Sequence, residues 1–176
     1  MIVVAVGANL PGPVGPPLAQ CEAALERMRA ASIGIAARSP WYESTPWPPS
    51  DQPRFVNGVV AVQTTLPPSE LLATLHQIER ALGRVRSVPN AARPLDLDLI
   101  DYDGLVRDGP EPPVLPHPRL AERDFVLRPL ADIAPAWRHP VSGLGVGELL
   151  ARLPHDPTLV RIGRPSGTES RFNNRA

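Results

Sequence analysis

The chain has 176 residues, 43% hydrophobic content and zero formal net charge, which suits one globular domain with a core. All 18 basic residues are arginine, so a Schiff-base enzyme and the lysine-bearing phosphate loop of common nucleotide-binding folds are excluded. Zero net charge argues against bulk binding to nucleic acid. With no apolar run near the ~18 residues of a membrane span and no signal-peptide pattern, we expect a cytoplasmic protein that binds no membrane.

The N-terminal part of the chain predicts a strand, a helix and two further strands. Residues 2–6 form an unbroken apolar run, which is typical of a buried central strand. Apolar residues recur at helical spacing from 18 to 31 and predict the first helix. A weaker strand signal covers 33–44, the proline-rich segment 45–53 predicts a loop, and residues 55–65 predict a clear strand.

The next segments complete a small α+β domain. Leucines at helical spacing predict a second helix over 67–82, and residues 95–102 predict a strand. The order strand, helix, strand, strand, helix, strand is that of a ferredoxin-like βαββαβ sheet. We expect helices on one face of this sheet and a ligand on the other, open face.

C-terminal additions follow this core pattern. Short helical signals cover 127–133 and 146–153. Residues 164–176 carry Phe172 as their one large apolar side chain. We therefore expect a domain over 1–163 and a disordered tail over 164–176.

The most informative stretch lies around Asp96 and Asp98, where leucine and aspartate alternate. The period of a strand places both carboxylates on one face, where they repel each other unless a cation lies between them. Oxygen ligands suit magnesium. Arg84, Arg86 and Arg93 precede this strand, and guanidinium groups bind phosphate oxygens in pairs. The segment predicts metal-assisted phosphoryl-type transfer, against the plainer interpretation of an edge strand with solvated aspartates.

Other side chains have ordinary structural interpretations. Cys21 cannot form an internal disulfide and fits a small core residue. Phe55 and Phe125 fit a hydrophobic core. Asn57 fits a strand bulge or an exposed strand end, and His117, between two prolines, fits a loop.

Several short blocks stand in a fixed order along the chain: VGANL (6–10), YESTP (42–46), QPRFVN (52–57), Glu79 with GRVR (83–86), RPLDLDL (93–99), PHPR (116–119) and RDFVLRPL (123–130). In this order and spacing they resemble the 6-hydroxymethyl-7,8-dihydropterin pyrophosphokinases of folate biosynthesis. The resemblance covers residues 2 to 153 and agrees with the ferredoxin-like fold.

The resemblance implies ATP as co-substrate, two Mg²⁺ ions, and transfer of a pyrophosphoryl group to the pterin hydroxymethyl with release of AMP. It assigns both metals to Asp96 and Asp98 and a catalytic role to Arg84 and Arg93. It also places a further group near the nucleotide: Glu79, Arg86, Leu99, His117 and Arg123. We expect a monomer.

The resemblance also implies a pterin pocket. Phe55 and Phe125 would stack on the two faces of the heterocycle, and Asn57 would bind its amide-like edge. The backbone groups that would bind its other polar atoms belong to Thr45, Pro46 and Trp47.

The chain departs from the family pattern before the aspartate strand. Many members carry Arg-Trp-Gly-Pro-Arg where this chain has residues 89–93, Pro-Asn-Ala-Ala-Arg. The tryptophan that closes over the substrate and one loop arginine have no counterpart. Pro94 and Ala8 replace the usual threonine and serine. The loops around Trp47 and over 85–92 are still expected to close over ATP.

Three other classes of protein share this topology. A non-catalytic module could bind a nucleotide or a pterin, and a different metal-dependent transferase could use ATP and ignore the pterin. An RNA-binding module would need stacked aromatic residues and a basic surface, which 5% aromatic content and zero net charge do not favour.

Overall fold

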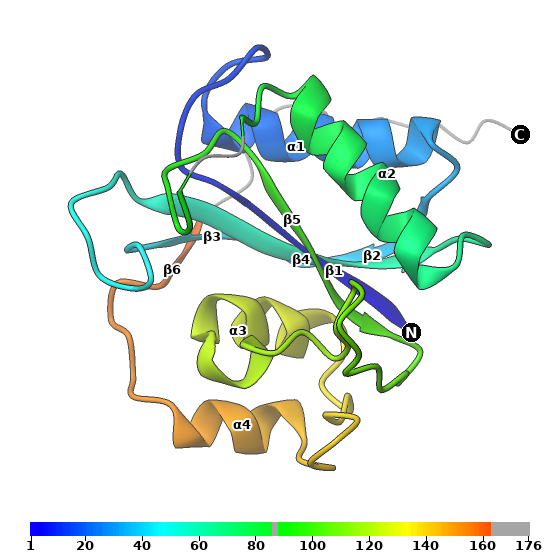
Figure 1. Ribbon diagram of the computed structural model, residues 1–176. Coiled ribbons are helices and arrows are strands. Elements are labelled where there is room, and N and C mark those ends of the chain that lie inside the picture. Colours follow the sequence, from blue (N-terminus) through cyan, green and yellow to red (C-terminus); the bar gives the residue numbers. More distant parts are fainter. Residues whose placement is uncertain (86–87, 163–176) are drawn as a thin grey trace, which may run out of the picture.

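Figure 1 shows the computed structural model of the chain, which describes residues 1–85 and 88–162. Within these residues, six strands form one antiparallel sheet. The strands are β1 (Ile2–Ala8), β2 (Gly34–Arg38), β3 (Trp41–Ser44), β4 (Phe55–Gln63), β5 (Asp96–Tyr102) and β6 (Val160–Ile162). The helices are α1 (Pro17–Ala30), α2 (Pro68–Ala81), α3 (Asp124–Ile133) and α4 (Val146–Arg152), with a short 3-10 turn at Leu120–Glu122. The tail expected over 164–176 lies outside the described residues.

The sheet has the order β5-β1-β4-β3-β6, and β2 also pairs with β4. The apolar strand β1 is central, as its sequence predicts, with Val4 paired to Val60 of β4 and to Leu99 of β5. If β2 and β3, which both pair with β4, are counted as one interrupted strand, the chain order up to β5 is that of a ferredoxin-like sheet, so the predicted α+β fold class is confirmed.

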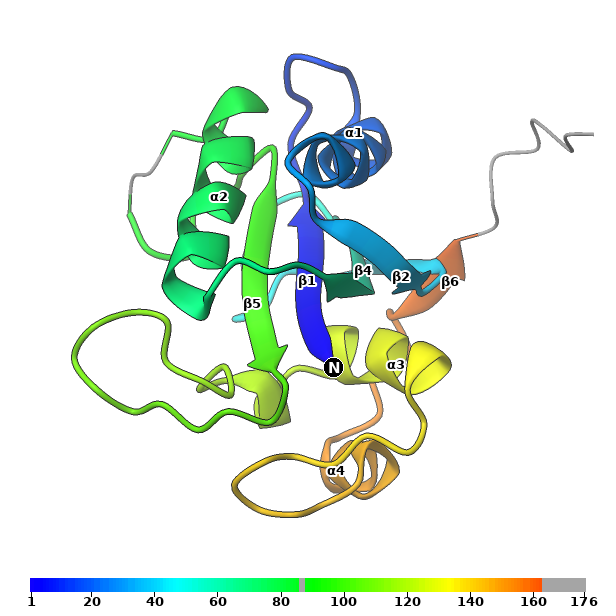
Figure 2. The same cartoon turned by 90° about the vertical axis from the view of Figure 1, so that its right-hand side faces the viewer.

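The first helical layer packs on one face of the sheet, as Figures 1 and 2 show for α1 and α2. Alternate residues of the strands, such as Val4 and Val6, join a core with Leu71 and Leu75 of α2. Cys21 belongs to this core and is fully buried, which confirms its sequence-based interpretation. Burying this apolar surface stabilises the fold by about 25 cal/mol per Å².

The second face of the sheet is not open along its whole length, so that expectation is corrected. A second core joins Val3 and Val59 of the sheet to Val126 and Leu130 of α3 and Leu149 of α4. Figures 1 and 2 show α3 and α4 on the side opposite α1 and α2. The C-terminal additions supply this cover because α3 and α4 carry their own apolar positions at helical spacing. None of the helices among the described residues is long and apolar enough to cross a membrane.

The strand predicted over 33–44 is two strands, and the break lies at Ser39 and Pro40. Proline has no backbone N–H to donate to a ladder. The Ser39 hydroxyl fills the gap by accepting a hydrogen bond from the Val59 N–H (3.0 Å) and donating to the Pro40 carbonyl (2.7 Å). Consequently β2 and β3 pair one after the other along the same edge of β4. Strand β6 has three residues and no clear pattern, and it was not predicted.

The close packing of Gly58 gives a first testable prediction. A methyl group on its Cα would lie 2.6 Å from ring carbons of Trp41. Gly58→Ala should therefore lower the free energy of unfolding by about 1–3 kcal/mol, because β4 or the ring must move. Gly147 in α4 has nothing within 4 Å of the same position, so Gly147→Ala is the matched control. The control should be neutral or stabilising by up to about 1 kcal/mol. Equal urea midpoints for the two variants would contradict this account.

Candidate active site

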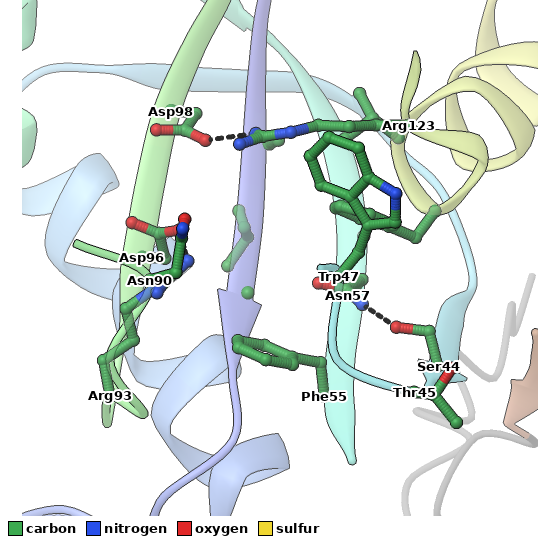
Figure 3. Close-up of a pocket in the computed structure, with 16 residues that line it drawn as sticks. Ser44, Thr45, Trp47, Phe55, Asn57, Asn90, Arg93, Asp96, Asp98 and Arg123 are labelled. Carbon is green, nitrogen blue, oxygen red and sulfur yellow. Dashed lines mark hydrogen bonds and ion pairs between the residues drawn. The ribbon is translucent and has the colours of Figure 1, made fainter. Parts of the chain in front are cut away.

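A pocket opens on the α3 side of the sheet and is lined by residues of β1, β4 and β5 and by Phe125 and Val126 of α3 (Figure 3). Ala5 and Gly7 of β1 lie at the bottom of the pocket, and their small side chain or lack of one leaves space above the sheet. A methyl group at Gly7 would lie 2.9 Å from Asn57 Oδ1, so glycine leaves room for that amide. The predicted site residues that line the pocket are Thr45, Trp47, Phe55, Asn57, Arg93, Asp96, Asp98, Arg123 and Phe125.

Asp96 and Asp98 lie on the same face of β5, as the alternation of the sequence predicts. Asp96 accepts hydrogen bonds from Arg84 Nη1 and from Arg93 Nη2, the latter at 2.7 Å. Asp98 accepts one from Arg123 Nη1 at 2.8 Å, as Figure 3 shows. Three arginines from different segments therefore neutralise the two carboxylates.

The electrostatic balance at Asp96 favours its charged form. Burial by itself would raise the pKa of Asp96, but the charges of Arg93 and Arg84 and their hydrogen bonds outweigh this effect. The pKa of Asp96 is therefore held below its usual range, and the group is a carboxylate at any physiological pH.

His117 lies beside Asp98, with Nε2 3.8 Å from Asp98 Oδ2. Burial lowers the pKa of His117 and outweighs the opposing effect of Asp98. The neutral imidazole accepts a hydrogen bond on Nδ1 from the Arg119 N–H (3.2 Å), which leaves the ring proton on Nε2, facing Asp98. At neutral pH the ring therefore adds a hydrogen-bond donor to the site without adding charge.

The guanidinium groups of Arg93 and Arg123 stay incompletely paired. Their Nε atoms are buried and have no hydrogen-bond partner among residues 1–85 and 88–162. An unsatisfied buried donor costs about 1–3 kcal/mol, so both groups favour an additional acceptor. Both residues line the pocket.

Aromatic rings form the walls next to these charges. The Arg93 guanidinium carbon lies 5.3 Å from the centre of the Phe55 ring, and that of Arg123 lies 5.7 Å from Phe125. Trp47 lies 5.6 Å from the Arg119 guanidinium carbon and 5.9 Å from that of Arg123. These distances are those of cation–π contacts. Both phenylalanines are half-buried and line the pocket, and Phe125 also packs against the second core.

Asn57 lies inside the sheet, in regular register opposite Gly7. It is 7% exposed, and its Nδ2 donates to Ser44 Oγ at 2.8 Å (Figure 3). The interpretation of Asn57 as a bulge or an exposed strand end is therefore wrong. Its location in the pocket wall gives a buried amide that can bind the edge of a ligand.

The other predicted residues that the structure describes do not line the pocket. Glu79, at the end of α2, binds Arg84, and the Leu99 side chain belongs to the core under α1 and α2, on the other face of the sheet. Pro46 is a buried residue of the loop between Thr45 and Trp47. Arg86 lies outside the described residues.

Sequence reasoning missed two polar residues that line the pocket, Ser44 and Asn90. Ser44 ends β3, and no periodicity marks it. Asn90 adopts a left-handed backbone conformation with φ of 59°, which asparagine tolerates better than most residues. The Pro-Asn dipeptide is a turn signal that could have indicated this bend, though not its role in the pocket.

On a ferredoxin-like sheet, paired carboxylates, clustered arginines and an aromatic pocket together define the site of a phosphoryl-type transferase. The family model for 7,8-dihydro-6-hydroxymethylpterin-pyrophosphokinase matches residues 3–135. The chain belongs to this family.

Curated relatives agree with this assignment. The chain is 44% identical over 156 residues to the 2-amino-4-hydroxy-6-hydroxymethyldihydropteridine pyrophosphokinase of Pseudomonas aeruginosa, covering 88% of this chain and 93% of that protein. It is 41% identical over 146 residues to the protein of the same name from Methylorubrum extorquens, covering 82% and 89%. It is also 41% identical over 130 residues to the folic acid synthesis protein fol1 of Pneumocystis carinii, covering 74% of this chain but only 17% of that longer protein.

The buried Glu79 gives a second testable prediction. Its Oε1 accepts hydrogen bonds from Arg84 Nη1 (2.8 Å) and from the Leu97 N–H (2.8 Å), so it ties α2 to β5. Glu79→Ala should cost about 2 kcal/mol of stability, because a buried N–H loses its acceptor. The control is Glu70→Ala at the exposed start of α2, which should cost no more than about 1 kcal/mol. Chemical denaturation measures both, and equal losses would refute the role of Glu79.

Proposed function

We propose that this protein transfers the pyrophosphoryl group of ATP to the hydroxymethyl oxygen of 6-hydroxymethyl-7,8-dihydropterin and releases AMP. The observation that carries the proposal is that one pocket is lined both by aromatic and amide side chains and by carboxylates with their arginines. Asn57 and the rings of Phe55 and Phe125 suit a flat heterocycle, and Asp96 and Asp98 with their arginines suit a polyphosphate. Membership of the pyrophosphokinase family supports the same reaction.

The pterin would lie between Phe55 and Phe125, where both faces of a flat ring find an aromatic partner. Asn57 supplies both a donor and an acceptor, which matches the amide-like edge of a pterin. Its Oδ1 is not engaged by Ser44, which takes the Nδ2 proton. Thr45, Pro46 and Trp47 follow β3 directly and offer backbone groups for the other polar atoms of the ligand.

Asp96 and Asp98 are the residues that would hold magnesium. Magnesium takes one or two carboxylates, while substrate phosphates and water complete its coordination. The residues that the structure describes hold no group of three or more Asp, Glu, His or Cys side chains placed around a metal position. Two bound ions would neutralise oxygens on both sides of the phosphorus–oxygen bond that breaks.

The arginines would bind the phosphate chain. Arg93 and Arg123 each carry a buried Nε without an acceptor among the described residues, and a phosphate oxygen is a strong acceptor for such groups. Arg84 is held by Glu79 and Asp96 and is not among the residues that line the pocket. Arg119, His117 and Arg86 are further candidates for contacts with ATP.

The reaction balances without a redox partner. The hydroxymethyl oxygen forms a bond to the β-phosphorus of ATP and loses its proton to the solvent. The bond from that phosphorus to the bridging α,β-oxygen breaks, and its electron pair leaves on AMP. Arginines beside the phosphate chain stabilise the charge that accumulates on AMP.

The deciding experiment measures AMP formation from ATP and Mg²⁺ with and without 6-hydroxymethyl-7,8-dihydropterin, followed by chromatography of the pterin product. Pterin-dependent AMP together with a diphosphorylated pterin supports the proposal. Binding of ATP without pterin-dependent AMP would refute it and would favour a binding module or a different ATP-dependent transferase.

Arg93→Ala tests the catalytic arginine. Because Arg93 would stabilise charge mainly in the transition state, we expect a loss in turnover of about 100-fold or more with a modest change in ATP affinity. Single-turnover rates equal to those of the wild type would exclude the role. Arg152→Ala on the exposed face of α4 is a control that also removes one arginine.

Asp96→Ala tests the metal ligand. The variant should lose the magnesium-dependent part of ATP binding, because one of the two carboxylate ligands is gone. Titration calorimetry with and without Mg²⁺ measures this part. If magnesium strengthened ATP binding equally in both proteins, Asp96 would not be a ligand. Asp108→Ala, in an exposed loop after β5, controls for the loss of one negative charge.

A further inference from the structure

Asn9, the residue that follows β1, is 2% exposed and holds the backbone of Arg93 from both sides. Its Oδ1 accepts a hydrogen bond from the Arg93 N–H at 2.8 Å. The backbone N–H groups of Asn9 and Leu10 donate to the Arg93 carbonyl at 3.0 and 3.2 Å. Both peptide groups of Arg93 are therefore bound by one short segment.

The same side chain reaches a second loop. Asn9 Nδ2 donates to Gln52 Oε1 (3.1 Å) and to the Pro53 carbonyl (3.2 Å), and Gln52 Nε2 donates to the Asn90 carbonyl (2.8 Å). We call this network, made by Asn9, Gln52, Pro53, Asn90 and the Arg93 backbone, the Asn9 clasp. It joins the end of β1, the β3–β4 loop and the segment before β5.

The clasp fixes the position of the Arg93 backbone, from which the side chain extends. That side chain binds the Ala91 carbonyl (2.8 Å) and Asp96 Oδ2 (2.7 Å), but these contacts involve the terminal nitrogens of a long, flexible chain. If the backbone could move, the guanidinium could reach other partners. A fixed backbone prevents this. Misplacing a reacting group by about 1 Å can cost on the order of 100-fold in rate.

We propose that Asn9 is a positioning residue that acts on the reaction through Arg93. This inference rests on the proposed function. Asn9 and Gln52 are not among the residues that line the pocket, so the proposed effect acts through position and needs no contact with substrate.

The test is a double-mutant cycle between Asn9 and Arg93. Asn9→Ala should lower kcat about tenfold or more, with a smaller change in the KM for the pterin. Arg93→Ala keeps the backbone groups that Asn9 binds but removes the guanidinium. If Asn9 acts through that guanidinium, Asn9→Ala should lower kcat by less than about twofold in the Arg93→Ala background. Equal effects in both backgrounds would overturn the proposal.

Two further variants separate positioning from loss of stability. Asp101→Ala removes a buried side chain that accepts hydrogen bonds from Trp137 Nε1 (2.7 Å) and the Gly104 N–H (3.0 Å) at the other end of β5. This control should be destabilised and retain the wild-type kcat. Gln52→Ala leaves the Asn9–Arg93 bonds in place and should lose less activity than Asn9→Ala. A parallel loss of kcat and stability across all three variants would show a merely structural role.

Asn9→Asp separates the two halves of the clasp. It keeps an acceptor for the Arg93 N–H but sets a carboxylate oxygen against Gln52 Oε1 and the Pro53 carbonyl in a site that is 2% exposed, so it should be less stable than the wild type. Its Arg93 amide should still be protected from hydrogen exchange, and a folded Asn9→Asp protein whose Arg93 amide has lost that protection would contradict the proposal.

Amide hydrogen exchange gives a readout that does not need turnover. The Arg93 amide should exchange faster in Asn9→Ala and unchanged in Asp101→Ala. If the wild type makes no pterin-dependent AMP, the proposed function has failed. The role of the Asn9 clasp is then tested by hydrogen exchange of the Arg93 amide alone. An Arg93 amide that exchanges equally in the wild type and in Asn9→Ala overturns the positioning role in either case.

Discussion

Repulsion between the two carboxylates on β5 is the constraint on which the site depends. Opposing charges come from three places: Arg84 after α2, Arg93 before β5 and Arg123 before α3. In the fold, α2 and α3 pack in cores on opposite faces of the sheet, and the segment after α2 and the residue before α3 both reach β5. The topology of the fold therefore supplies the charges that the two carboxylates need.

The pocket lies at the edge of the second core. Val3 and Val59 pack under α3 and α4, Ala5 packs against this core and also lines the pocket, and Gly7 lines the pocket further along β1. The small residues Ala5 and Gly7 leave space above β1, and the rings of Phe55 and Phe125 enclose that space. The apolar part of the site is thus an extension of the second core, and the polar part begins at β5.

Local sequence patterns predicted the carboxylate pair of the site but not the contacts between distant strands. Alternation along one strand placed Asp96 and Asp98 together, since the side-chain period of a strand is two. Asn57 could not be placed from its neighbours, because its burial depends on the register with Gly7 in another strand. The Asn9–Arg93 contact joins residues 84 positions apart and follows no period, so only the folded chain reveals it. The break between β2 and β3 depends on Ser39 bonding to β4, which is also non-local.

The stacking of arginines on aromatic rings has a consequence for ligand entry. Arg93 covers one face of Phe55 and Arg123 one face of Phe125, and both rings line the pocket. A planar molecule that binds on such a face must displace a cation from it, so its net affinity is the difference between two stacking energies. A flat ligand can therefore stack on such a face only when the guanidinium leaves it. An anion that binds the arginines elsewhere would raise the affinity of the pocket for flat molecules.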